Sequence, residues 1–278
     1  MDTKFIHTLI SVVRTGSFAG AARSENLTPA AVSQRVRSLE AELGETLIVR
    51  SGQRVTATPA CLSILGRMRH IVNEVDKIAG DLDATGLNGR LRLGAISTAL
   101  GDRVPGILSR FAKQAPMTEL SITPGTSEGL FAMLDNEEID AALIAAPPFK
   151  IPKAIQVIEI ERQPFILIAQ AQDQRTDEQI INDDKVLVYD PKSWGGRLVT
   201  PWIAERVRPG QILCELDALE AIATAIGQGI GCAIVPDWPG LSSIETIRRI
   251  TLKDMTCQRK IVLAHRRLHP AILRLLEA

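Results

Sequence analysis

The sequence of 278 residues contains few of the side chains that build reactive sites. It has four cysteines and four histidines, and aromatic residues make up only 4% of the chain. Cys61, Cys214, Cys232 and Cys257 form no CxxC pair and have no metal-ligand spacing, so they predict neither a disulfide framework nor a zinc site. Basic and acidic residues are equal in number, 32 each, and the net charge by itself therefore does not indicate a nucleic-acid partner.

The chain also lacks signatures of targeting, membrane insertion and catalysis. Its longest apolar runs, such as residues 141–149, are far shorter than the roughly 18–20 residues of a membrane helix. The N-terminus has an acidic residue at position 2 and no small-residue cleavage site, unlike a signal peptide. No GxSxG, HExxH, P-loop or GxGxxG motif is present, and His265 and His269 span an expected strand-to-helix change that does not suit a metal site. We expect a cytoplasmic protein without membrane contact, metal or cofactor.

Helix start and stop signals predict three short helices near the N-terminus. Gly16 ends the first helix and Ser17 caps the second. Thr28, followed by a proline at the first helical position, caps the third helix, which ends at Gly44. Apolar residues on either side of residues 51–53 then predict two short strands joined by a hairpin loop.

The second and third of these helices have the composition of a helix-turn-helix. Residues 16–22 read GSFAGAA, and such small side chains allow the next helix to cross closely. The third helix carries short polar residues at its N-terminal end, as a recognition helix in the major groove requires. A small helical bundle with solvated arginines is the alternative. The residues that we expect at DNA are Thr28, Ala30, Ser33 and Gln34 at base edges, Arg37 at the phosphate backbone, and Arg50 and Arg54 of the hairpin at phosphates or the minor groove.

A long helix is predicted to begin at Pro59 and to continue to Gly80. Apolar residues recur along it at alternating intervals of four and three, which is the pattern of a seam between two helices. We therefore expect this helix to pair two subunits. The alternative is a helix packed on its own domain, and isoleucines at 64, 71 and 78 widen the apolar stripe in that direction. The residues of the expected seam are Cys61, Leu65, Met68, Val72, Val75, Ala79 and Leu82.

The remainder of the chain alternates apolar strands with helices, which predicts a mainly parallel α/β fold. The expected strands are Leu91–Ala95, Leu120–Thr123, Ala141–Ala145, Phe165–Ala169, Val186–Tyr189, Gly231–Val235 and Lys260–Ala264. The expected helices between them are Leu100–Gln114, Glu128–Asp135 and Leu219–Gly227.

These motifs together resemble the LysR-type transcriptional regulators. The family pattern of a GSFxxAA helix, a recognition helix ending in Leu-Glu and a wing closing on Thr-Pro is present within residues 5–65. Further along, residues 89–94 (GRLRLG), 139–143 (IDAAL) and 229–236 (GIGCAIVP) are similar to strands of the family's effector domain. The SQRVR sequence at 33–37 is most similar to the branch that governs basic amino-acid export, but the Asp-Ser-x-x-Thr-Trp sequence of that branch is absent.

The resemblance implies a regulator that binds promoter or operator DNA as a double strand and responds to a small-molecule effector. It also implies a homo-oligomer, either a dimer or a dimer of dimers, with RNA polymerase as a further partner. An enzyme with an α/β catalytic domain fused to a DNA-binding domain is the alternative, but no histidine lies near the candidate loops. The implied α/β architecture is a winged helix-turn-helix (1–58), a long dimerisation helix and linker (59–88), and a two-lobed effector domain like that of periplasmic binding proteins (89–278), with lobe one at 91–161 and 269–278 and lobe two at 162–268.

The effector site is expected at strand ends and helix N-termini, where free N–H groups favour an anion. Hydroxyls facing an arginine would suit a carboxylate-bearing ligand, and a tryptophan could stack on a ring. The alternatives are that the hydroxyls only cap helices and that the tryptophan belongs to a mobile loop. The expected ligand residues are Ser97, Thr98, Thr126 and Ser127 in lobe one and Asp190, Ser193, Trp194 and Arg197 in lobe two.

The cysteines allow two interpretations. One branch of the family uses two nearby cysteines as a peroxide switch, but a predicted helix separates Cys214 from Cys232. Cys232 also lies in an apolar strand, so we expect buried, unreactive thiols.

Overall fold

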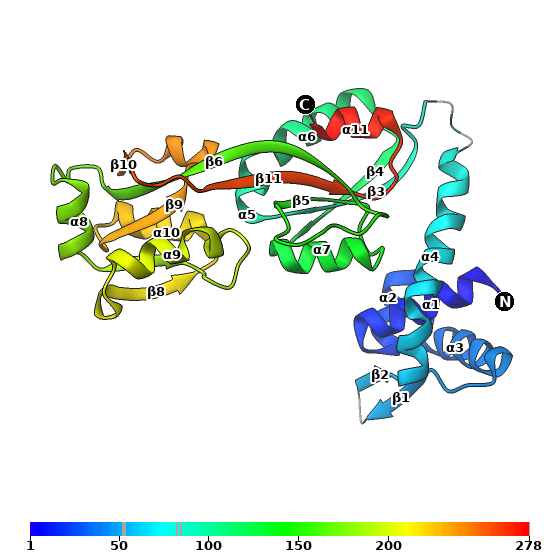
Figure 1. The fold of residues 1–278 in the computed structure, drawn as a ribbon. Coiled ribbons are helices and arrows are strands. Elements are labelled where there is room, and N and C mark those ends of the chain that lie inside the picture. Colours follow the sequence, from blue (N-terminus) through cyan, green and yellow to red (C-terminus); the bar gives the residue numbers. More distant parts are fainter. Residues whose placement is uncertain (52–53, 82, 84, 278) are drawn as a thin grey trace. The chain divides into compact units, whose positions relative to one another are not determined.

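The computed structural model describes residues 1–51, 54–81, 83 and 85–277. The chain folds as two compact units, one of Met1–Ala84 with Asn136–Glu138 and the other of Thr85–Asp135 with Ile139–Ala278 (Figure 1). We call them the N-terminal unit and the effector unit.

The N-terminal unit consists of three short helices, a hairpin and a long helix. The predicted caps are confirmed, since the Ser17 hydroxyl accepts a hydrogen bond from the Gly20 N–H and the Thr28 hydroxyl accepts one from the Ala31 N–H. Gly44 ends the third helix with φ of 71°, in the left-handed region that glycine adopts most readily. The elements are α1 (Thr3–Thr15), α2 (Phe18–Glu25), α3 (Pro29–Leu43), β1 (Ile48–Ser51), β2 (Arg54–Ala57) and α4 (Pro59–Asp81).

One polar network holds the three short helices together. Arg35 of α3 donates to the Thr8 hydroxyl of α1 at 3.2 Å and to the Glu25 carboxylate of α2 at 3.5 Å. The Thr8 hydroxyl in turn donates to Glu25 at 2.7 Å. Because Thr8 is buried and Glu25 is nearly so, Arg35 has a structural role, which is to hold the three helices together. The exposed arginines of the unit remain available for a partner.

The apolar stripe of α4 is divided between the chain's own core and the surface. Cys61, Leu65, Met68 and Val72 are buried, because this half of the helix packs against α1. For them, the expectation of a seam between subunits is wrong, and the alternative of a helix packed on its own domain holds. Val75 and Ile78 are 43% and 58% exposed and remain candidates for an intersubunit contact. The Ala79 side chain and Leu82 lie outside the described residues.

The effector unit is an α/β structure with one continuous mixed sheet. The strand order is β4-β3-β5-β11-β6-β9-β7-β8, with β10 paired to β6. Its elements are β3 (Gly89–Ala95), α5 (Ser97–Asp102), α6 (Val104–Gln114), β4 (Thr118–Pro124), α7 (Ser127–Asp135), β5 (Ala141–Ala145), β6 (Gln156–Gln170), α8 (Asp177–Asp183), β7 (Val186–Tyr189), α9 (Gly196–Arg206), η1 (Pro209–Gln211), β8 (Ile212–Leu216), α10 (Leu219–Gly227), β9 (Cys232–Pro236), η2 (Pro239–Ser243), β10 (Ile247–Thr251), β11 (Gln258–His265) and α11 (Pro270–Glu277).

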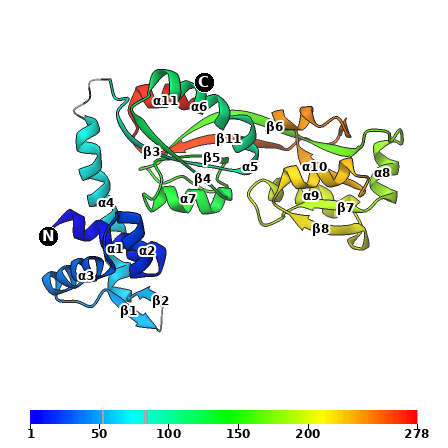
Figure 2. The ribbon, with the colours of Figure 1, turned by 180° about the vertical axis from the view of Figure 1, so that it is seen from behind.

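Two long antiparallel strands, β6 and β11, run from one lobe of this unit to the other (Figure 1). Lobe one contains β3, β4 and β5, with α7 on one face of the sheet and α6 and α11 on the other (Figure 2). Lobe two contains β7–β10 with α8, α9 and α10. Within each lobe, β3 pairs in parallel with β4 and β5, and β7 pairs in parallel with β8 and β9. The expected parallel sheet is thus present in each lobe, joined by antiparallel crossing strands.

The boundary of lobe two at residue 268 is corrected by the packing of β11. From Ile261 to His265 this strand pairs with β5, and Ile261–Ala264 are part of the apolar core of lobe one. The chain therefore returns to lobe one near Ile261.

The strands β8 and β10 and the helices α8 and α9 were not predicted. The strand β8 lies at the edge of the sheet with most of its residues exposed or half-buried, and α9 contains Pro201, so neither has the usual apolar pattern.

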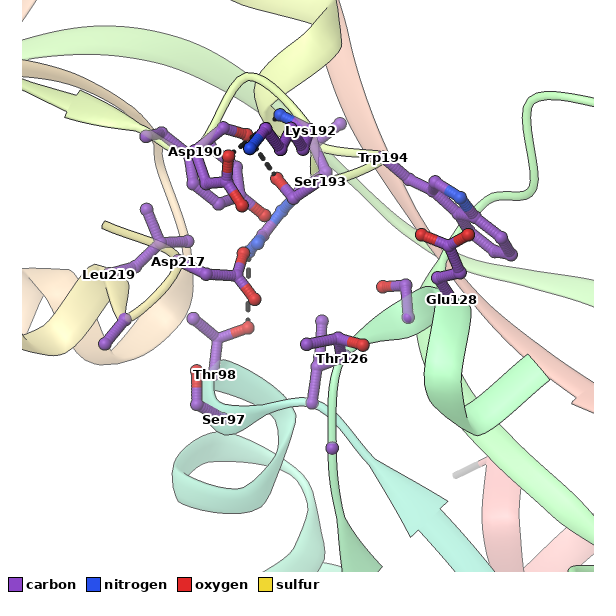
Figure 3. A pocket seen from close by; sticks show the side chains of 16 residues that line it. Ser97, Thr98, Thr126, Glu128, Asp190, Lys192, Ser193, Trp194, Asp217 and Leu219 are labelled. Atoms are coloured by element: carbon purple, nitrogen blue, oxygen red, sulfur yellow. Dashed lines mark hydrogen bonds between the residues drawn. The ribbon is translucent and has the colours of Figure 1, made fainter. Parts of the chain in front are cut away.

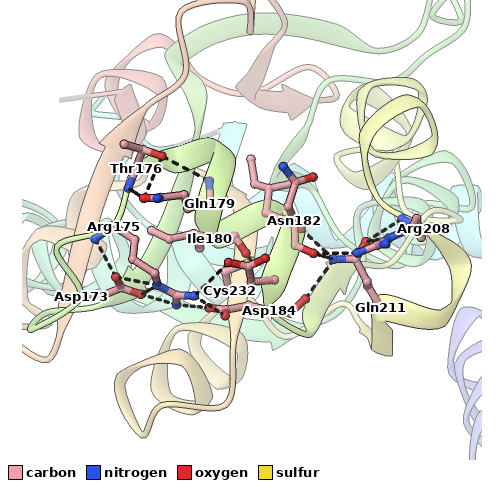
Figure 4. A network of polar contacts seen from close by, with 12 residues as sticks. Asp173, Arg175, Thr176, Gln179, Ile180, Asn182, Asp184, Arg208, Gln211 and Cys232 are labelled. Atoms are coloured by element: carbon pink, nitrogen blue, oxygen red, sulfur yellow. Dashed lines mark hydrogen bonds and ion pairs between the residues drawn. The ribbon is translucent and has the colours of Figure 1, made fainter.

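A network of charged and polar side chains surrounds α8 in lobe two (Figure 4). Arg175 forms ion pairs with Asp173 at 2.7 Å and Asp184 at 2.8 Å, and it lowers the pKa of the Asp173 carboxyl by hydrogen bonding. The Gln211 amide donates to the carbonyl oxygens of Ile181 and Asn182, both at 2.8 Å. These bonds satisfy carbonyl groups at the end of α8, which the helix itself leaves without partners.

Gly231 is a position in lobe two where only glycine fits. Its φ is +100°, and a Cβ there would lie 2.1 Å from the Lys185 carbonyl oxygen. We expect Gly231→Ala to lower the free energy of unfolding by more than about 2 kcal/mol, because backbone strain of about 1–3 kcal/mol adds to the clash. The matched control is Gly210→Ala, since no atom lies within 4 Å of the added methyl group. Urea unfolding followed by tryptophan fluorescence measures both variants, because all three tryptophans lie in the effector unit. Equal stability of the two variants would contradict this account.

Candidate functional site

A cavity of about 380 Å³ lies between the two lobes of the effector unit (Figure 3). Parallel pairing explains its position. Ala95 of β3 is paired with Pro124 of β4, so the residues that follow these strands emerge at one edge of lobe one. Tyr189 of β7 is paired with Leu216 of β8, which has the same consequence in lobe two. A volume of this size suits a small organic ligand.

The lobe-one wall contains all four hydroxyl residues expected there, and three of the hydroxyls already have partners. Thr126 accepts from the Gly129 N–H at 3.2 Å and so caps the first turn of α7. Ser127 accepts from the Ala145 N–H at 3.0 Å, and Thr98 accepts from an arginine described below. The capping alternative therefore applies to Thr126. Ser97 is exposed and has no hydrogen-bond partner among the described residues.

The lobe-two wall contains Asp190, Ser193 and Trp194, as expected. Ser193 donates to the Asp190 carbonyl oxygen at 2.8 Å and accepts from the Gly196 N–H at 3.0 Å. Its hydroxyl therefore shapes the loop that enters α9. The Asp190 carboxylate accepts from the Lys192 N–H at 2.9 Å, which fixes the position of one carboxylate oxygen.

Trp194 joins the two lobes at one side of the pocket. Its side chain is 7% exposed, and its ring centroid lies 5.7 Å from that of Phe131 and 5.4 Å from that of Phe149. Both contacts are edge-to-face, an arrangement that aromatic rings favour. The mobile-loop alternative does not apply, because a residue of the lobe-two loop is packed in the core of lobe one.

The arginine of the pocket is Arg259 of β11, and Arg197 is exposed on α9 outside the lining. The Arg259 side chain is 1% exposed. It donates from Nε to the Gln163 side-chain oxygen at 2.8 Å and from Nη2 to the Thr98 hydroxyl at 3.3 Å. No carboxylate of the described chain lies within 4.0 Å of its guanidinium nitrogens. Arg259 lies two residues before the apolar run IVLAH of the same strand, and this buried charge next to an apolar run was the sequence signal that was missed.

Two carboxylates that sequence reasoning did not find also line the pocket. Glu128 and Asp217 line it together with Asp190, and in Figure 3 the acids Asp190 and Asp217 lie on the lobe-two side. Burial raises the pKa of the Asp217 carboxyl, and the charge of Asp190 raises it further. A hydrogen bond with Ser193 and the charge of Arg259 partly oppose this rise. Asp217 follows β8, and because that strand was not predicted its strand end was not considered.

A basic and polar face of α3 forms the second candidate surface. Gln34 and Arg37 are exposed, and Ser33 is half-buried beside them. These three residues and Ala30 border one shallow depression on the surface of the N-terminal unit. Thr28, Arg50 and Arg54 are also exposed, and the Arg50 guanidinium lies 4.7 Å from the centre of the Phe18 ring. Val32, Val36 and Leu39 are buried on the opposite face of α3.

All four cysteines are free thiols. Cys61 and Cys232 are buried, as expected, whereas Cys214 and Cys257 are half-buried. Burial raises the pKa of the Cys232 thiol to about 12 and also raises that of Cys61.

Two family models match the chain. The model described as LysR substrate binding domain covers residues 84–278, and that described as bacterial regulatory helix-turn-helix protein, lysR family, covers residues 3–62. The transcriptional activator IlvY of Salmonella typhimurium is 25% identical over 256 residues, which are 89% of this chain and 86% of the relative. The regulator CzcR of Bacillus anthracis is 25% identical over 237 residues, which are 85% and 80% of the two chains.

Solved structures of the same architecture are similar along the whole chain. Full-length OxyR from Pseudomonas aeruginosa superposes with a TM-score of 0.74 at 21% identity, covering 100% of this chain and 93% of the other. CbnR in complex with its target DNA has a TM-score of 0.63 at 18% identity, covering 99% and 97%. At these identities the likeness concerns the fold.

A helix-turn-helix unit followed by a two-lobed α/β unit defines a ligand-responsive DNA-binding protein rather than an enzyme. The chain belongs to the LysR family of transcriptional regulators. It binds DNA through its N-terminal unit, and a small molecule bound by its effector unit modulates its activity. Among the described residues, no helix has the length and apolar character needed to cross a bilayer.

The face of α3 predicts a division of roles between Gln34 and Arg37. Gln34→Ala should lower the preference for specific over non-specific DNA by about 1–3 kcal/mol, the range of a good bidentate base contact. Arg37→Ala should weaken binding to all sequences and reduce the salt dependence, because a phosphate contact releases counterions without reading sequence. Arg67→Ala, an exposed arginine of α4, is the control. Fluorescence anisotropy over a salt series measures all three. The division of roles is wrong if both α3 variants lose affinity equally for every sequence.

The buried thiols predict an order of alkylation. With its pKa raised to about 12, Cys232 is protonated at neutral pH, and its thiolate fraction is on the order of one in 10⁵. We expect iodoacetamide to modify Cys232 and Cys61 last in the folded protein and rapidly after unfolding in urea. Peptide mass spectrometry over time gives the rate at each site. Early modification of Cys232 in the folded state would show that the thiol is accessible.

Proposed function

We propose that the pocket between the lobes binds a carboxylate-bearing effector, with Arg259 as the charge that receives it. The observation that carries this proposal is the environment of Arg259. Its guanidinium lines the cavity, is 1% exposed, and is bonded to two neutral oxygens. Burial of a charge is costly unless an opposite charge or hydrogen bonds compensate for it. A ligand carboxylate would supply the missing counter-charge in an arginine–carboxylate geometry.

Lobe one offers further donors toward the same anion. The N-terminus of α7 borders the pocket, and its first-turn N–H groups carry partial positive charge. The Ser97 hydroxyl is free to donate. Thr98, by contrast, holds Arg259 in place and is a positioning residue. In this proposal Ser127 and Ser193 shape the walls, because their hydroxyls are engaged with backbone groups.

Binding in this pocket supports a mechanism through the spacing of the lobes. The crossing strands β6 and β11 provide a hinge, and the contact of Trp194 with Phe131 and Phe149 holds the lobes together at the pocket. A ligand that contacts both walls favours the lobe spacing in which both sets of contacts are made. In an oligomer, this change would alter the separation of the DNA-binding units.

We further propose that the functional form is a homo-oligomer, a dimer or a dimer of dimers, acting on promoter DNA in the cytoplasm. The exposed apolar side chains of Val75 and Ile78 on α4 support a contact between subunits. RNA polymerase is the partner through which such a regulator would act on transcription. The proposed DNA contacts are those of Thr28, Ala30, Ser33, Gln34, Arg37, Arg50 and Arg54.

The effector proposal is tested by separating the two arginines considered for the site. Arg259→Gln keeps a polar side chain and removes the charge, so it should weaken carboxylate binding about tenfold to a hundredfold, as expected for a charged hydrogen bond. Arg197→Gln removes an exposed charge and should leave the affinity unchanged. A thermal-shift screen of mono- and dicarboxylates on the wild type, followed by calorimetry, gives the affinities. Circular dichroism confirms that both variants are folded. Undiminished binding to Arg259→Gln would overturn the proposal.

A further inference from the structure

Two carboxylates stand side by side on the lobe-two wall of the pocket. The Asp190 N–H donates to the Leu216 carbonyl oxygen at 2.9 Å, so the residues that end β7 and β8 leave the sheet at the same level. Asp190 and Asp217 therefore follow adjacent parallel strands, and both line the cavity. Neighbouring like charges repel one another when they are only partly solvated.

These acids lack a cationic partner within the described chain. No lysine, arginine or histidine nitrogen of the described residues lies within 4.0 Å of either carboxylate. Arg259 is near enough to Asp217 to oppose the rise of its pKa, but its hydrogen bonds go to Gln163 and Thr98. Lys192 is exposed at the rim of the pocket. The cavity thus has a cationic floor and an acidic wall, each incompletely compensated.

We infer that the effector is a zwitterion, a molecule whose carboxylate meets Arg259 and whose protonated amine meets Asp217 and Asp190. This inference rests on the proposed carboxylate site. A simple carboxylate would compensate Arg259 and leave the acidic pair repelling each other and the ligand. An ammonium group provides three donors, enough for both carboxylates. The volume of about 380 Å³ admits an amino acid together with a sizeable side chain.

The partial burial of Asp217 should make the acidic pair discriminate between ligands with and without an amine. Asp217 is half-buried, and its pKa is raised by burial and by Asp190, so its charged form is less favourable in the pocket than in water. An ammonium group removes that penalty, whereas a hydroxyl in its place removes only part of it. Discrimination between ligands that differ at this one group should therefore be large, as it is where a missing partner leaves a buried polar group unpaired.

The experiment compares ligands that differ only at the amine. The twenty common amino acids, their 2-hydroxy acids and their decarboxylated amines are screened by thermal shift on the full-length protein, and calorimetry gives the affinities of those that bind. We expect at least one amino acid to bind about tenfold or more tightly than its 2-hydroxy acid, with the amine alone binding weakly. Asp217→Asn and Asp190→Asn should each reduce that preference. Glu215→Gln, which removes an exposed charge of β8 outside the pocket, should preserve it.

The outcomes separate the two proposals. A 2-hydroxy acid that binds as tightly as its amino acid, a preference that survives Asp217→Asn and Asp190→Asn, or no binding by any amino acid overturns the zwitterion inference. In the first two cases, loss of carboxylate binding in Arg259→Gln would leave the proposed carboxylate site standing. Binding of amines alone, unaffected by Arg259→Gln, overturns the carboxylate site itself. Stabilisation by magnesium or calcium chloride without an organic ligand would identify the acidic pair as a cation site and overturn the inference.

Discussion

The pairing of β6 with β11 is the interaction on which the effector unit depends. These strands carry the chain from one lobe to the other and back, and their register places Arg259 opposite Gln163. The hydrogen bond between these two side chains is thus a consequence of strand pairing. From Gln163 the network continues to Glu161, which forms an ion pair with Arg103 at 2.8 Å. The charge at the floor of the pocket is therefore connected through hydrogen bonds to the strands about which the lobes would move.

Polar groups at the strand ends are arranged differently on the two walls of the pocket. On the lobe-one wall, the Thr126 and Ser127 hydroxyls accept hydrogen bonds from backbone N–H groups and the Thr98 hydroxyl accepts one from Arg259. On the lobe-two wall, Asp190 and Asp217 are held close together at the ends of adjacent strands. The result is a cavity in which rigid backbone positions a few uncompensated charges. Such charges are the groups that a ligand can recognise with high discrimination.

The helix α3 has a buried face that serves stability and an exposed face on which we propose the DNA contacts. One face of α3 is buried with α1 and α2, and Arg35 joins all three helices through Thr8 and Glu25. The opposite face presents Gln34 and Arg37 to solvent. Because Arg35 and Arg37 are two residues apart, they lie on different sides of the helix. Two arginines that look alike in the sequence therefore have different surroundings.

Local signals in the sequence determined most of the N-terminal unit. Caps and glycines fix helix ends through hydrogen bonds within a few residues, so α2 and α3 could be placed closely from Ser17, Thr28 and Gly44. Buried central strands such as Ala141–Ala145 were also recognisable, because they are continuously apolar. The hydroxyl residues that follow β3 and β4 were found because the ends of parallel strands meet at one edge of a sheet. Helix caps and apolar strands depend on residues that are close together in the chain, so the sequence by itself is enough to recognise them.

Only the tertiary structure decided which partner each side chain meets. Val72 and Val75 both belong to the expected seam, yet Val72 is buried in the core that α4 shares with α1 and Val75 is exposed. Arg197 lies near a candidate loop and Arg259 does not, yet the antiparallel crossing of β11 brings Arg259 into the pocket and leaves Arg197 outside it. Trp194 packs in lobe one although its loop belongs to lobe two. In each case the deciding contact joins residues far apart in the chain, and no local pattern encodes it.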